Sequence, residues 1–229
     1  MPFVDRSDAG RQLAKALTAY KGQRPVVLAL PRGGVPVAAE VAAMLDAPLD
    51  LILVRKIGTP YQPELAMGAV VDGGQPVTVR NEDVIRLSGV SEQEFNATRD
   101  EQLGEIERRR KLYLGDRPHS ELAGRVVIVV DDGIATGATT RAALQATRIR
   151  KPRKLVLAVP VAPTDTLRKL RGDVDDLVCL EDYAQFGAIG YFYSDFRQVS
   201  DAEVIDILAR HPLKPEASSK EEKARTRFD

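Results

Sequence analysis

Short runs of branched apolar residues alternate along the chain with segments of helical periodicity. The clearest run is Val126 to Val130, five valine or isoleucine residues in succession, which is typical of a strand buried on both faces of a parallel sheet. We expect further core strands at residues 26–30, 49–54, 155–159 and 176–180. Strands that alternate with helices in this way predict an α/β fold, a doubly wound and mostly parallel sheet of about five core strands.

Helical segments lie between these strands. Apolar residues recur at helical spacing over residues 6–20, with Leu13, Leu17 and Tyr20 on one stripe, which predicts an amphipathic helix. Further helices are expected at residues 35–46, 141–148, 164–171 and 200–210, the last opened by a capping box at Ser200. We expect Pro160 to end the strand that contains it, and Thr164 to cap the helix that follows.

The region between the second core strand and Val126 departs from this alternation. Residues 57–63 contain a glycine and two prolines, so they are expected to be irregular, and short strands are expected at 65–71 and 77–79. Residues 81–115 are predicted to form a helical insertion, with Asn81 capping a short helix and a capping box at Ser91 opening a longer one. The longer helix is mostly polar, which is typical of a surface or of contact with a partner subunit, so a homodimer is left open.

The end of the chain carries two further features. Half of the aromatic residues fall within residues 183–196, where they form either a small hydrophobic hood over the sheet end or one wall of a binding site. Residues 212–229 are charged and contain proline, so they are predicted to be a disordered tail. We therefore expect one domain over residues 1–211, with the insertion at about 81–115.

Charge and cysteine content exclude several functional classes. The 229 residues carry 33 Lys and Arg against 33 Asp and Glu, a balance that argues against a general role on nucleic acid or a membrane surface. No apolar stretch is long enough to span a bilayer, and no signal pattern opens the sequence. Cys179, the single cysteine, is expected to be a core residue. A reducing cytoplasm fits these observations.

Candidate chemistry follows directly after the central strand. Asp131 and Asp132 come at its carboxyl end, where open α/β sheets bind their ligands. The loop from Gly133 to Thr140 brings backbone N–H groups and threonine hydroxyls to the start of a helix, which favours binding of a phosphate. It is not a P-loop, because no lysine follows the glycine. A pair of acids beside an anion site suits a 5-phosphorylated ribose. The ribose hydroxyls would donate hydrogen bonds to the two carboxylates, and the loop would hold the phosphate.

A second strand end has similar chemistry. Pro31, Arg32, Gly33 and Gly34 follow the first core strand and precede a helix. The two glycines allow close approach of backbone N–H groups to an anion, and Arg32 adds a cation. We therefore expect a second anion site on the same edge of the sheet.

The strand, the acid pair and the small-residue loop together resemble the signature of the type I phosphoribosyltransferases. The resemblance implies that phosphoribosyl pyrophosphate (PRPP) binds at Gly33 and Gly34 and along the loop Gly133, Ile134, Ala135, Thr136, Gly137, Ala138, Thr139 and Thr140. It implies catalytic roles for Arg32 and Lys56 as cations on pyrophosphate, and for Asp131 and Asp132 on the ribose hydroxyls. It further implies Mg²⁺, held by the two acids indirectly through ribose hydroxyls or water, and a mobile lid that contains residues 57–63.

The acceptor is not identified by the sequence. Ala135 stands where the 6-oxopurine branch of that family carries an acid, so the proton acceptor of that branch is missing. Candidate acceptor contacts are Glu181, Asp182 and Tyr183. Two functions are left open: a transferase of nucleotide metabolism that acts on a nitrogenous acceptor such as a nucleobase, or a PRPP-binding regulator. Arg32, Lys56 and the lid favour the enzyme, and the lack of a recognisable acceptor pocket favours the regulator.

Overall fold

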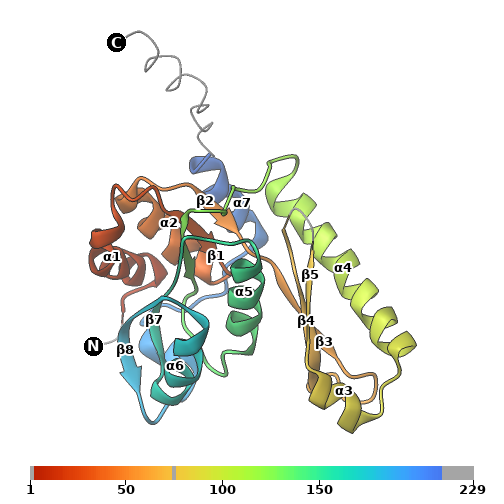
Figure 1. The fold of residues 1–229 in the computed structure, drawn as a ribbon. Coiled ribbons are helices and arrows are strands. Elements are labelled where there is room, and N and C mark those ends of the chain that lie inside the picture. The colour runs from red at the N-terminus through yellow and green to blue at the C-terminus, as the bar shows by residue number, and fades with distance from the viewer. Residues whose placement is uncertain (1–2, 74–75, 213–229) are drawn as a thin grey trace.

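Five parallel strands form the central sheet of the protein (Figure 1). The computed structural model describes residues 3–73 and 76–212. The strands lie in the order β2-β1-β6-β7-β8, and they are β1 (Val26–Ala29), β2 (Leu49–Leu51), β6 (Val126–Val130), β7 (Lys154–Pro163) and β8 (Asp176–Tyr183). The chain moves outward from β1 to β2 and then returns to the other side of β1 at β6. This reversal is the topological switch point, at which open α/β sheets bind ligands.

Helices cover both faces of the sheet, so the predicted doubly wound α/β fold is confirmed. The helices α1 (Arg6–Ala16) and α2 (Gly34–Leu45) pack on the face that Ile128 presents, and α5 (Ala138–Ile149) and α6 (Thr164–Leu170) pack on the face that Val127 presents. All five residues of β6 are fully buried, because successive side chains of a strand point to opposite faces. The helix α7 (Asp201–Arg210) packs on α2 and α4.

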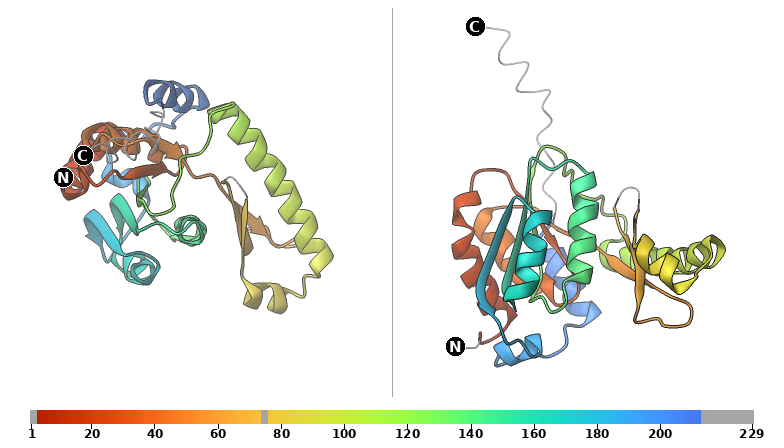
Figure 2. Two further views of the ribbon diagram at one scale, coloured as in Figure 1. Left: turned by 45° about the horizontal axis from the view of Figure 1, so that its top comes forward. Right: turned by 60° about the horizontal axis from the view of Figure 1, so that its bottom comes forward.

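A second, antiparallel sheet stands beside the core (Figure 2). Its strands are β3 (Val54–Gly58), β4 (Ala66–Val71) and β5 (Val77–Arg80), followed by α3 (Glu82–Ser88) and α4 (Glu92–Leu114). The sheet packs against α4 and against α5 of the core. We call residues 54–115 the side unit. The caps predicted for its helices are confirmed, with Asn81 at α3 and the capping box of Ser91 at α4.

Sequence predictions about several element bounds were wrong. The strand expected at 176–180 runs on to Tyr183 in β8, and two errors concern the entry to the side unit. The run predicted as one strand at 49–54 belongs to two sheets, because β2 ends at Leu51 and β3 begins at Val54. Ile52 and Leu53, between the two strands, are also buried. The apolar run therefore continues without a break, and the sequence pattern does not show where the chain leaves one sheet for the other. The expectation that residues 57–63 are irregular fails at Ile57 and Gly58, which pair with β4.

The other two errors concern β7 and its exit. The strand continues through Pro160 to Pro163. It can do so because β6 ends opposite Ala158, and beyond that point β7 pairs with β8 alone, a position that tolerates proline. Thr164 is the first residue of α6 and not its cap, since its hydroxyl donates to Asp182 Oδ2 at 2.6 Å.

Three other expectations meet the structure in different ways. Cys179 is only partly buried, against the side of the core that faces α5, and burial raises the pKa of its thiol to about 12.

Within residues 3–73 and 76–212, no helix has the length and apolar character needed to cross a bilayer. The tail predicted at 212–229 lies, from residue 213 on, outside the described residues.

A partly buried histidine, His119, joins the core to the side unit, and the sequence pattern does not indicate it. His119 Nδ1 lies 3.6 Å from Asp50 Oδ2 in β2, and His119 Nε2 lies 3.0 Å from Asp72 Oδ1 at the end of β4. Both aspartates are almost fully buried. Their hydrogen bonds outweigh the effect of burial and raise the pKa of His119 to about 9.

We expect this cluster to make stability depend on pH. The folded pKa of His119, about 9, lies above the unfolded value of about 6.5, so its stabilisation is complete below pH 6.5 and is lost as pH rises through about 9. Urea unfolding should show His119→Asn less stable than the wild type by roughly 3 kcal/mol at pH 6, with the gap closing above pH 9. His211→Asn is the control. A gap that is independent of pH would contradict the prediction.

Candidate functional site

The two strand ends that carry the candidate chemistry meet at the switch point. The loop 31–34 follows β1, and Asp131 and Asp132 follow β6, the neighbouring strand. A Cβ added at Gly33 would lie 2.0 Å from Asp132 Oδ2, and one added at Gly34 would lie 2.8 Å from the carbonyl oxygen of Val130. The loop and the acid pair are therefore in direct contact, and only glycine allows it.

The loop after β1 exposes the start of a helix. Its Pro31–Arg32 peptide bond is cis, and α2 begins at Gly34 without a side-chain cap. The N–H groups of Gly34 and Val35 donate to the carbonyl oxygens of Leu30 and Arg32 at 3.0 and 3.2 Å, and Pro36 has no N–H. An anion at this end would therefore meet the N–H groups of the loop itself and the positive end of the α2 dipole. The anion site expected at residues 31–34 stays a prediction.

Asp132 is buried and Asp131 is partly buried, so the two acids lie close together with little solvent around them. Asp132 is 8% exposed, and its backbone N–H donates to Asp131 Oδ1 at 2.9 Å. Burial, together with the charge of Asp132, raises the pKa of Asp131 well above its usual value. Burial also raises the pKa of Asp132, and the guanidinium of Arg6 opposes that rise.

Arg6 is a site residue that the sequence analysis missed. Its Nε lies 2.7 Å from Asp132 Oδ2, with 11% of each side chain exposed. Tyr193, in the hood of residues 183–196, contacts the same residue from the other end of the chain, donating its hydroxyl to the carbonyl oxygen of Asp132 at 2.5 Å. The first turn of α1 and the hood therefore both converge on the acid pair.

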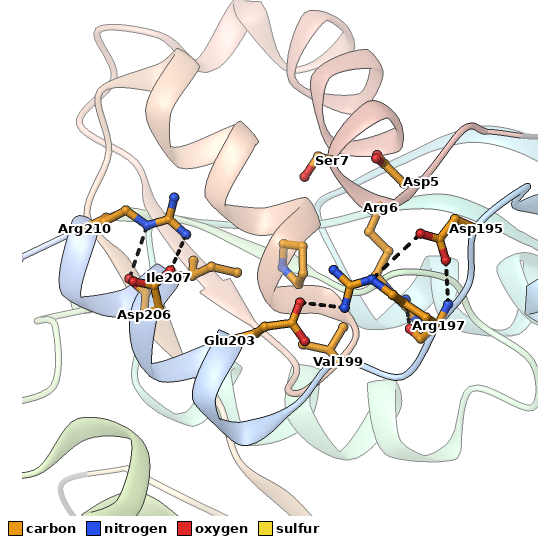
Figure 3. A pocket seen from close by; sticks show the side chains of 11 residues that line it. Asp5, Arg6, Ser7, Asp195, Arg197, Val199, Glu203, Asp206, Ile207 and Arg210 are labelled. Carbon is orange, nitrogen blue, oxygen red and sulfur yellow. Dashed lines mark hydrogen bonds and ion pairs between the residues drawn. The ribbon is translucent and has the colours of Figure 1, made fainter.

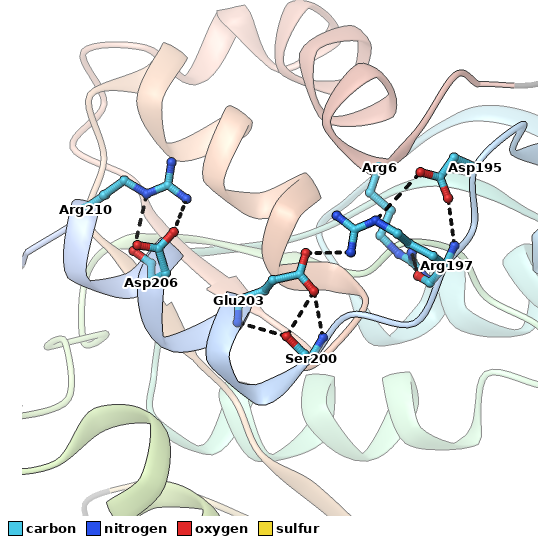
Figure 4. Close-up of polar contacts among 7 residues, drawn as sticks. All are labelled: Arg6, Asp195, Arg197, Ser200, Glu203, Asp206 and Arg210. Atoms are coloured by element: carbon cyan, nitrogen blue, oxygen red, sulfur yellow. Dashed lines mark hydrogen bonds and ion pairs between the residues drawn. The ribbon is translucent and has the colours of Figure 1, made fainter.

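A cavity of about 290 Å³ opens on the far side of Arg6 (Figure 3). It lies between the start of α1, the first turn of α2, the segment 195–199 and α7. Its charged side chains pair with one another, as Figure 4 shows for Arg197 with Glu203 at 2.7 Å and for Arg210 with Asp206 at 2.7 Å. Arg6 thus separates the acid pair from this polar cavity.

The loop predicted to hold a phosphate has an exposed and a buried set of side chains. Ala135, Thr136, Ala138 and Thr139 are at least partly exposed, and α5 begins at Ala138 without a side-chain cap. Thr140, by contrast, is 3% exposed, so its hydroxyl does not face solvent with the others.

Core contacts fix the shape of this loop. The backbone N–H of Ile134 donates to the carbonyl oxygen of Val161 at 3.0 Å, and the hydroxyl of Thr166 donates to that of Ala135 at 2.9 Å. Gly137 has φ +78°, the left-handed region that favours glycine. Packing on β7 and α6 therefore holds the loop in place before any ligand binds.

The two predicted cations do not occupy the same place. Arg32 Nη1 lies 3.5 Å from Asp201 Oδ1 at the start of α7, and Tyr113 donates to the same oxygen at 2.6 Å. Lys56 Nζ lies 3.0 Å from Glu64 Oε2, and the lysine lines a cavity of about 230 Å³ that it shares with the first turn of α5. Arg32 therefore belongs to loop 31–34 and pairs with the start of α7, whereas Lys56 lies beside the phosphate loop.

The residues expected to contact the acceptor, Glu181, Asp182 and Tyr183, form hydrogen bonds with neighbouring side chains. The hydroxyl of Tyr183 donates to Glu181 Oε2, and Asp182 accepts from Thr164. The ring of Phe192 packs against Tyr183 at 4.8 Å and against Phe186 at 4.9 Å between centroids. These residues lie at and beyond the end of β8, the edge strand, so this part of the hood packs largely on itself.

Because loop 31–34 touches the acid pair, adding a single methyl group at Gly33 should change the affinity for PRPP. In Gly33→Ala the new Cβ would displace the carboxylate of Asp132, and we expect PRPP affinity to fall by about tenfold, the equivalent of roughly 1.4 kcal/mol. Calorimetry with PRPP measures the change. Gly104→Ala is the matched control, because a Cβ there meets no atom within 4 Å. Equal affinity in both variants would contradict the geometry.

Comparison with known proteins finds a matching family model and two curated relatives. The family model described as "Phosphoribosyl transferase domain" matches residues 6–195. Two curated proteins of Mycobacterium tuberculosis, from strains CDC 1551 and H37Rv, each bear the name "Putative phosphoribosyl transferase" and are 49% identical over 208 residues. The match covers 91% of this chain and 46% of each relative, so the chain spans about half the length of these curated relatives.

A solved structure gives the same relationship in three dimensions. The crystal structure of TT1426 from Thermus thermophilus is 40% identical in sequence and superposes with a TM-score of 0.77. The alignment covers 93% of this chain and 100% of that one. The similarity therefore extends over the sheet, the side unit and the hood together.

Proposed function

Because the chain belongs to the phosphoribosyl transferase family, we propose that it transfers the 5-phosphoribosyl group of PRPP to a nitrogenous acceptor of the nucleobase class and releases pyrophosphate. The observation that carries the proposal is the contact between two loops at the switch point. The loop 31–34 and the acid pair touch where Gly33 meets Asp132, so one ligand can engage both.

Each part of PRPP has a matching group in this site. The 5-phosphate would bind the backbone N–H groups of residues 135–139 with the hydroxyls of Thr136 and Thr139, which are exposed. Asp131 and Asp132 would accept from the ribose hydroxyls. The pyrophosphate would lie against loop 31–34 and the uncapped start of α2.

The reaction breaks the bond between the anomeric carbon and a pyrophosphate oxygen, which keeps the electron pair. The acceptor nitrogen forms a new bond to that carbon and gives up its proton. Positive charge develops on the sugar ring and negative charge on the leaving group. The N–H groups of loop 31–34, the positive end of the α2 dipole and the guanidinium of Arg32 would stabilise that negative charge. A closed site would exclude water, which would otherwise compete with the acceptor.

The acid pair also fits Mg²⁺. Within the part of the chain that the structure describes, no group of three or more His, Cys, Asp or Glu residues is placed to hold a metal ion by itself. Mg²⁺ keeps several waters and binds through one or two carboxylates together with substrate phosphates, so Asp131 and Asp132 with PRPP oxygens are a suitable donor set. Bound there, Mg²⁺ would neutralise charge on the leaving pyrophosphate.

One assay tests the proposal directly. Pyrophosphate release is measured with PRPP and Mg²⁺ across a panel of purine and pyrimidine bases, for the wild type and for a variant that carries Asp131→Asn with Asp132→Asn. We expect release with at least one base and none with the variant. Release that persists in the double variant would contradict the role given to the acid pair, and absence of release with every base would remove the transferase assignment.

One observation favours a second candidate function, a PRPP-binding regulator. Glu181, Asp182 and Tyr183 all hydrogen-bond to neighbouring side chains, so the hood offers an acceptor few free polar groups. A regulator would bind PRPP with an affinity that depends on the acid pair and would release no pyrophosphate with any base. Calorimetry and the release assay on the same sample separate the two functions.

The turn between β3 and β4 is the proposed lid. Thr59 holds it in a compact form, because its hydroxyl donates to the carbonyl oxygen of Gln62 at 2.8 Å, and Tyr61 at its tip is 83% exposed. If the turn closes over PRPP, limited proteolysis at residues 59–65 should slow when PRPP and Mg²⁺ are added. Cleavage at the same rate with and without ligand would count against closure.

A further inference from the structure

A cavity between the side unit and α5 takes no part in the proposed reaction. It is the cavity of about 230 Å³ that Lys56 lines, and we call it the side cavity. One wall is the sheet of the side unit and the other is α5, which stand next to each other (Figure 2). The side cavity is therefore bordered both by the helix that follows the phosphate loop and by the sheet that carries the proposed lid.

The sheet wall opens where a row of large side chains gives way to a row with a small one. Alternate residues of a strand share a face. One row across the three strands consists of valines, and it packs with alanines of α5 in one buried cluster. The next row on the same face is Lys56, Ala69 and Val79. Ala69 has only a methyl group to place between sheet and helix, so the side cavity begins at this row.

The helix wall is the side of α5 and not its N-terminus. Ala138, Arg141, Ala142 and Gln145 line the cavity, and their spacing of three and four positions places them on one face over about two turns. Of the phosphate loop, Ala138 and Thr139 reach the cavity. The space therefore continues along the helix, beyond the residues proposed to bind the 5-phosphate.

The chemistry of the lining favours an apolar ring that carries a negative charge. Valine and alanine side chains form most of both walls, and Asn81 and Gln145 add amide groups. Three of the lining residues are basic, and among the described residues no acid lines the cavity. Mostly apolar walls with a few polar groups are typical of small-molecule sites. The volume is below the about 300–1,000 Å³ of pockets that hold drug-sized ligands, so the ligand must be small.

Lys56 is the basic residue best placed to bind the negative charge. The other two, Arg80 and Arg141, each pair with acids outside the cavity. The partner of Lys56 is Glu64, which is 93% exposed, and a surface ion pair of this kind contributes little to stability. An anion in the side cavity can therefore replace Glu64 at little cost.

We propose that the side cavity is a second ligand site, which binds a small aromatic ring with one acidic group. The ring would lie between Ala69 and Ala142, and the acidic group would bind Lys56. The site is separate from the PRPP site and does not depend on the proposed function. A ligand held there would contact the side unit and α5 at the same time, and so would join the sheet that carries the lid to the core.

The first test uses indole-3-carboxylate as a fluorescent probe on the full chain. The sequence contains no tryptophan, so indole emission reports the probe alone. Indole-3-carboxamide has the same shape without the charge. We expect saturable binding of the carboxylate and binding of the carboxamide that is at least about tenfold weaker, because hydrogen bonds to a charged group are stronger than neutral ones. Equal binding of the two probes, or no saturable binding of either, would overturn the inference.

A charge variant shows whether Lys56 binds the acidic group. Lys56→Met keeps an apolar stem and removes the charge, so it should bind the carboxylate no better than the carboxamide. Lys111→Met is the matched control, because Lys111 pairs with Glu107 on α4, away from the cavity, and it should bind both probes as the wild type does. A preference for the carboxylate that persists in Lys56→Met would overturn the inference.

Filling variants locate the ring. Ala69→Leu places a larger side chain in the cavity from the sheet wall and should weaken binding of the carboxylate by at least about tenfold, since the ring loses its space. Gln145→Phe narrows the cavity from the helix wall, at a partly exposed position, and replaces Ala69→Leu if that variant does not fold. Wild-type affinity in a folded filling variant would contradict the assigned position.

A last titration separates the side cavity from the PRPP site. The carboxylate probe is titrated with PRPP and Mg²⁺ present in excess, and we expect it still to bind. Competitive displacement of the probe by PRPP would place it in the PRPP site and overturn the inference. If the chain binds no PRPP, the proposed function fails, whereas the response of the probe to Lys56→Met and Ala69→Leu still decides whether the side cavity is a ligand site.

Discussion

Replacing both acids of the pair, Asp131→Asn with Asp132→Asn, is expected to lower PRPP affinity by at least about 10²-fold, because each hydrogen bond to a charged group contributes roughly 1.5–3 kcal/mol. The neutral amides have nearly the same shape as the carboxylates. They also remove the repulsion between two buried acids, whose pKa values are both raised. The fold should therefore be retained while the ribose loses its charged acceptors.

Calorimetry with PRPP and Mg²⁺ measures this loss, and thermal unfolding shows whether the variant is folded. The matched control is Asp206→Asn, an acid that pairs with Arg210 on the surface of α7 and should leave PRPP affinity as it is. Unchanged affinity in a folded double variant would mean that the acids at the switch point do not hold the ribose.

Removing the cation of the loop after β1, in Arg32→Ala, is expected to cost on the order of 10²-fold in turnover. Its charge matters most when the bond to pyrophosphate lengthens and negative charge grows on the leaving group. An interaction that strengthens toward the transition state lowers turnover more than it lowers substrate binding. At rest Arg32 lies 3.5 Å from Asp201, and both side chains are partly exposed, so little holds the guanidinium away from a ligand.

Steady-state kinetics of pyrophosphate release, compared with PRPP affinity by calorimetry, separate the two effects. Asp201→Asn is the control, since it breaks the same ion pair from the other side. If Arg32 acts only by joining the loop to α7, both variants should lose turnover alike. If Arg32 acts on pyrophosphate, Asp201→Asn should keep its turnover. A loss of affinity in Arg32→Ala with turnover unchanged would contradict a role in the transition state.

Local features of the sequence predicted much of the fold and part of the site. The central strand, the acid pair and the phosphate loop follow one another directly in the sequence. A local sequence pattern is therefore enough to predict where they lie in the fold. The capping boxes at Ser91 and Ser200 are confirmed for the same reason, because each depends on residues three positions apart. The parallel sheet with helices on both faces follows from the alternation of strands and helices.

The features that sequence reasoning missed depend on residues far apart. Arg6 contacts Asp132 across 126 positions, and nothing in its local pattern distinguishes it from the other arginines. His119 depends on one aspartate within β2 and on another that directly follows β4. The change of sheet after Leu51 is hidden because residues on both sides of it are equally buried. Lys56 was chosen by resemblance, and its action on pyrophosphate stays a prediction.

The hood pairs with the first described residues of the chain. The backbone N–H of Phe3 donates to the carbonyl oxygen of Phe192 at 2.7 Å, and that of Ser194 donates to the carbonyl oxygen of Phe3 at 2.8 Å. A chain emerging from the ribosome can form β1, β6 and the phosphate loop well before residue 192 is synthesised. The hood is therefore completed last, and its closure must overcome the entropy of joining distant segments. Until then the nascent chain exposes the acid pair to water, and the environment that perturbs its protonation does not yet exist.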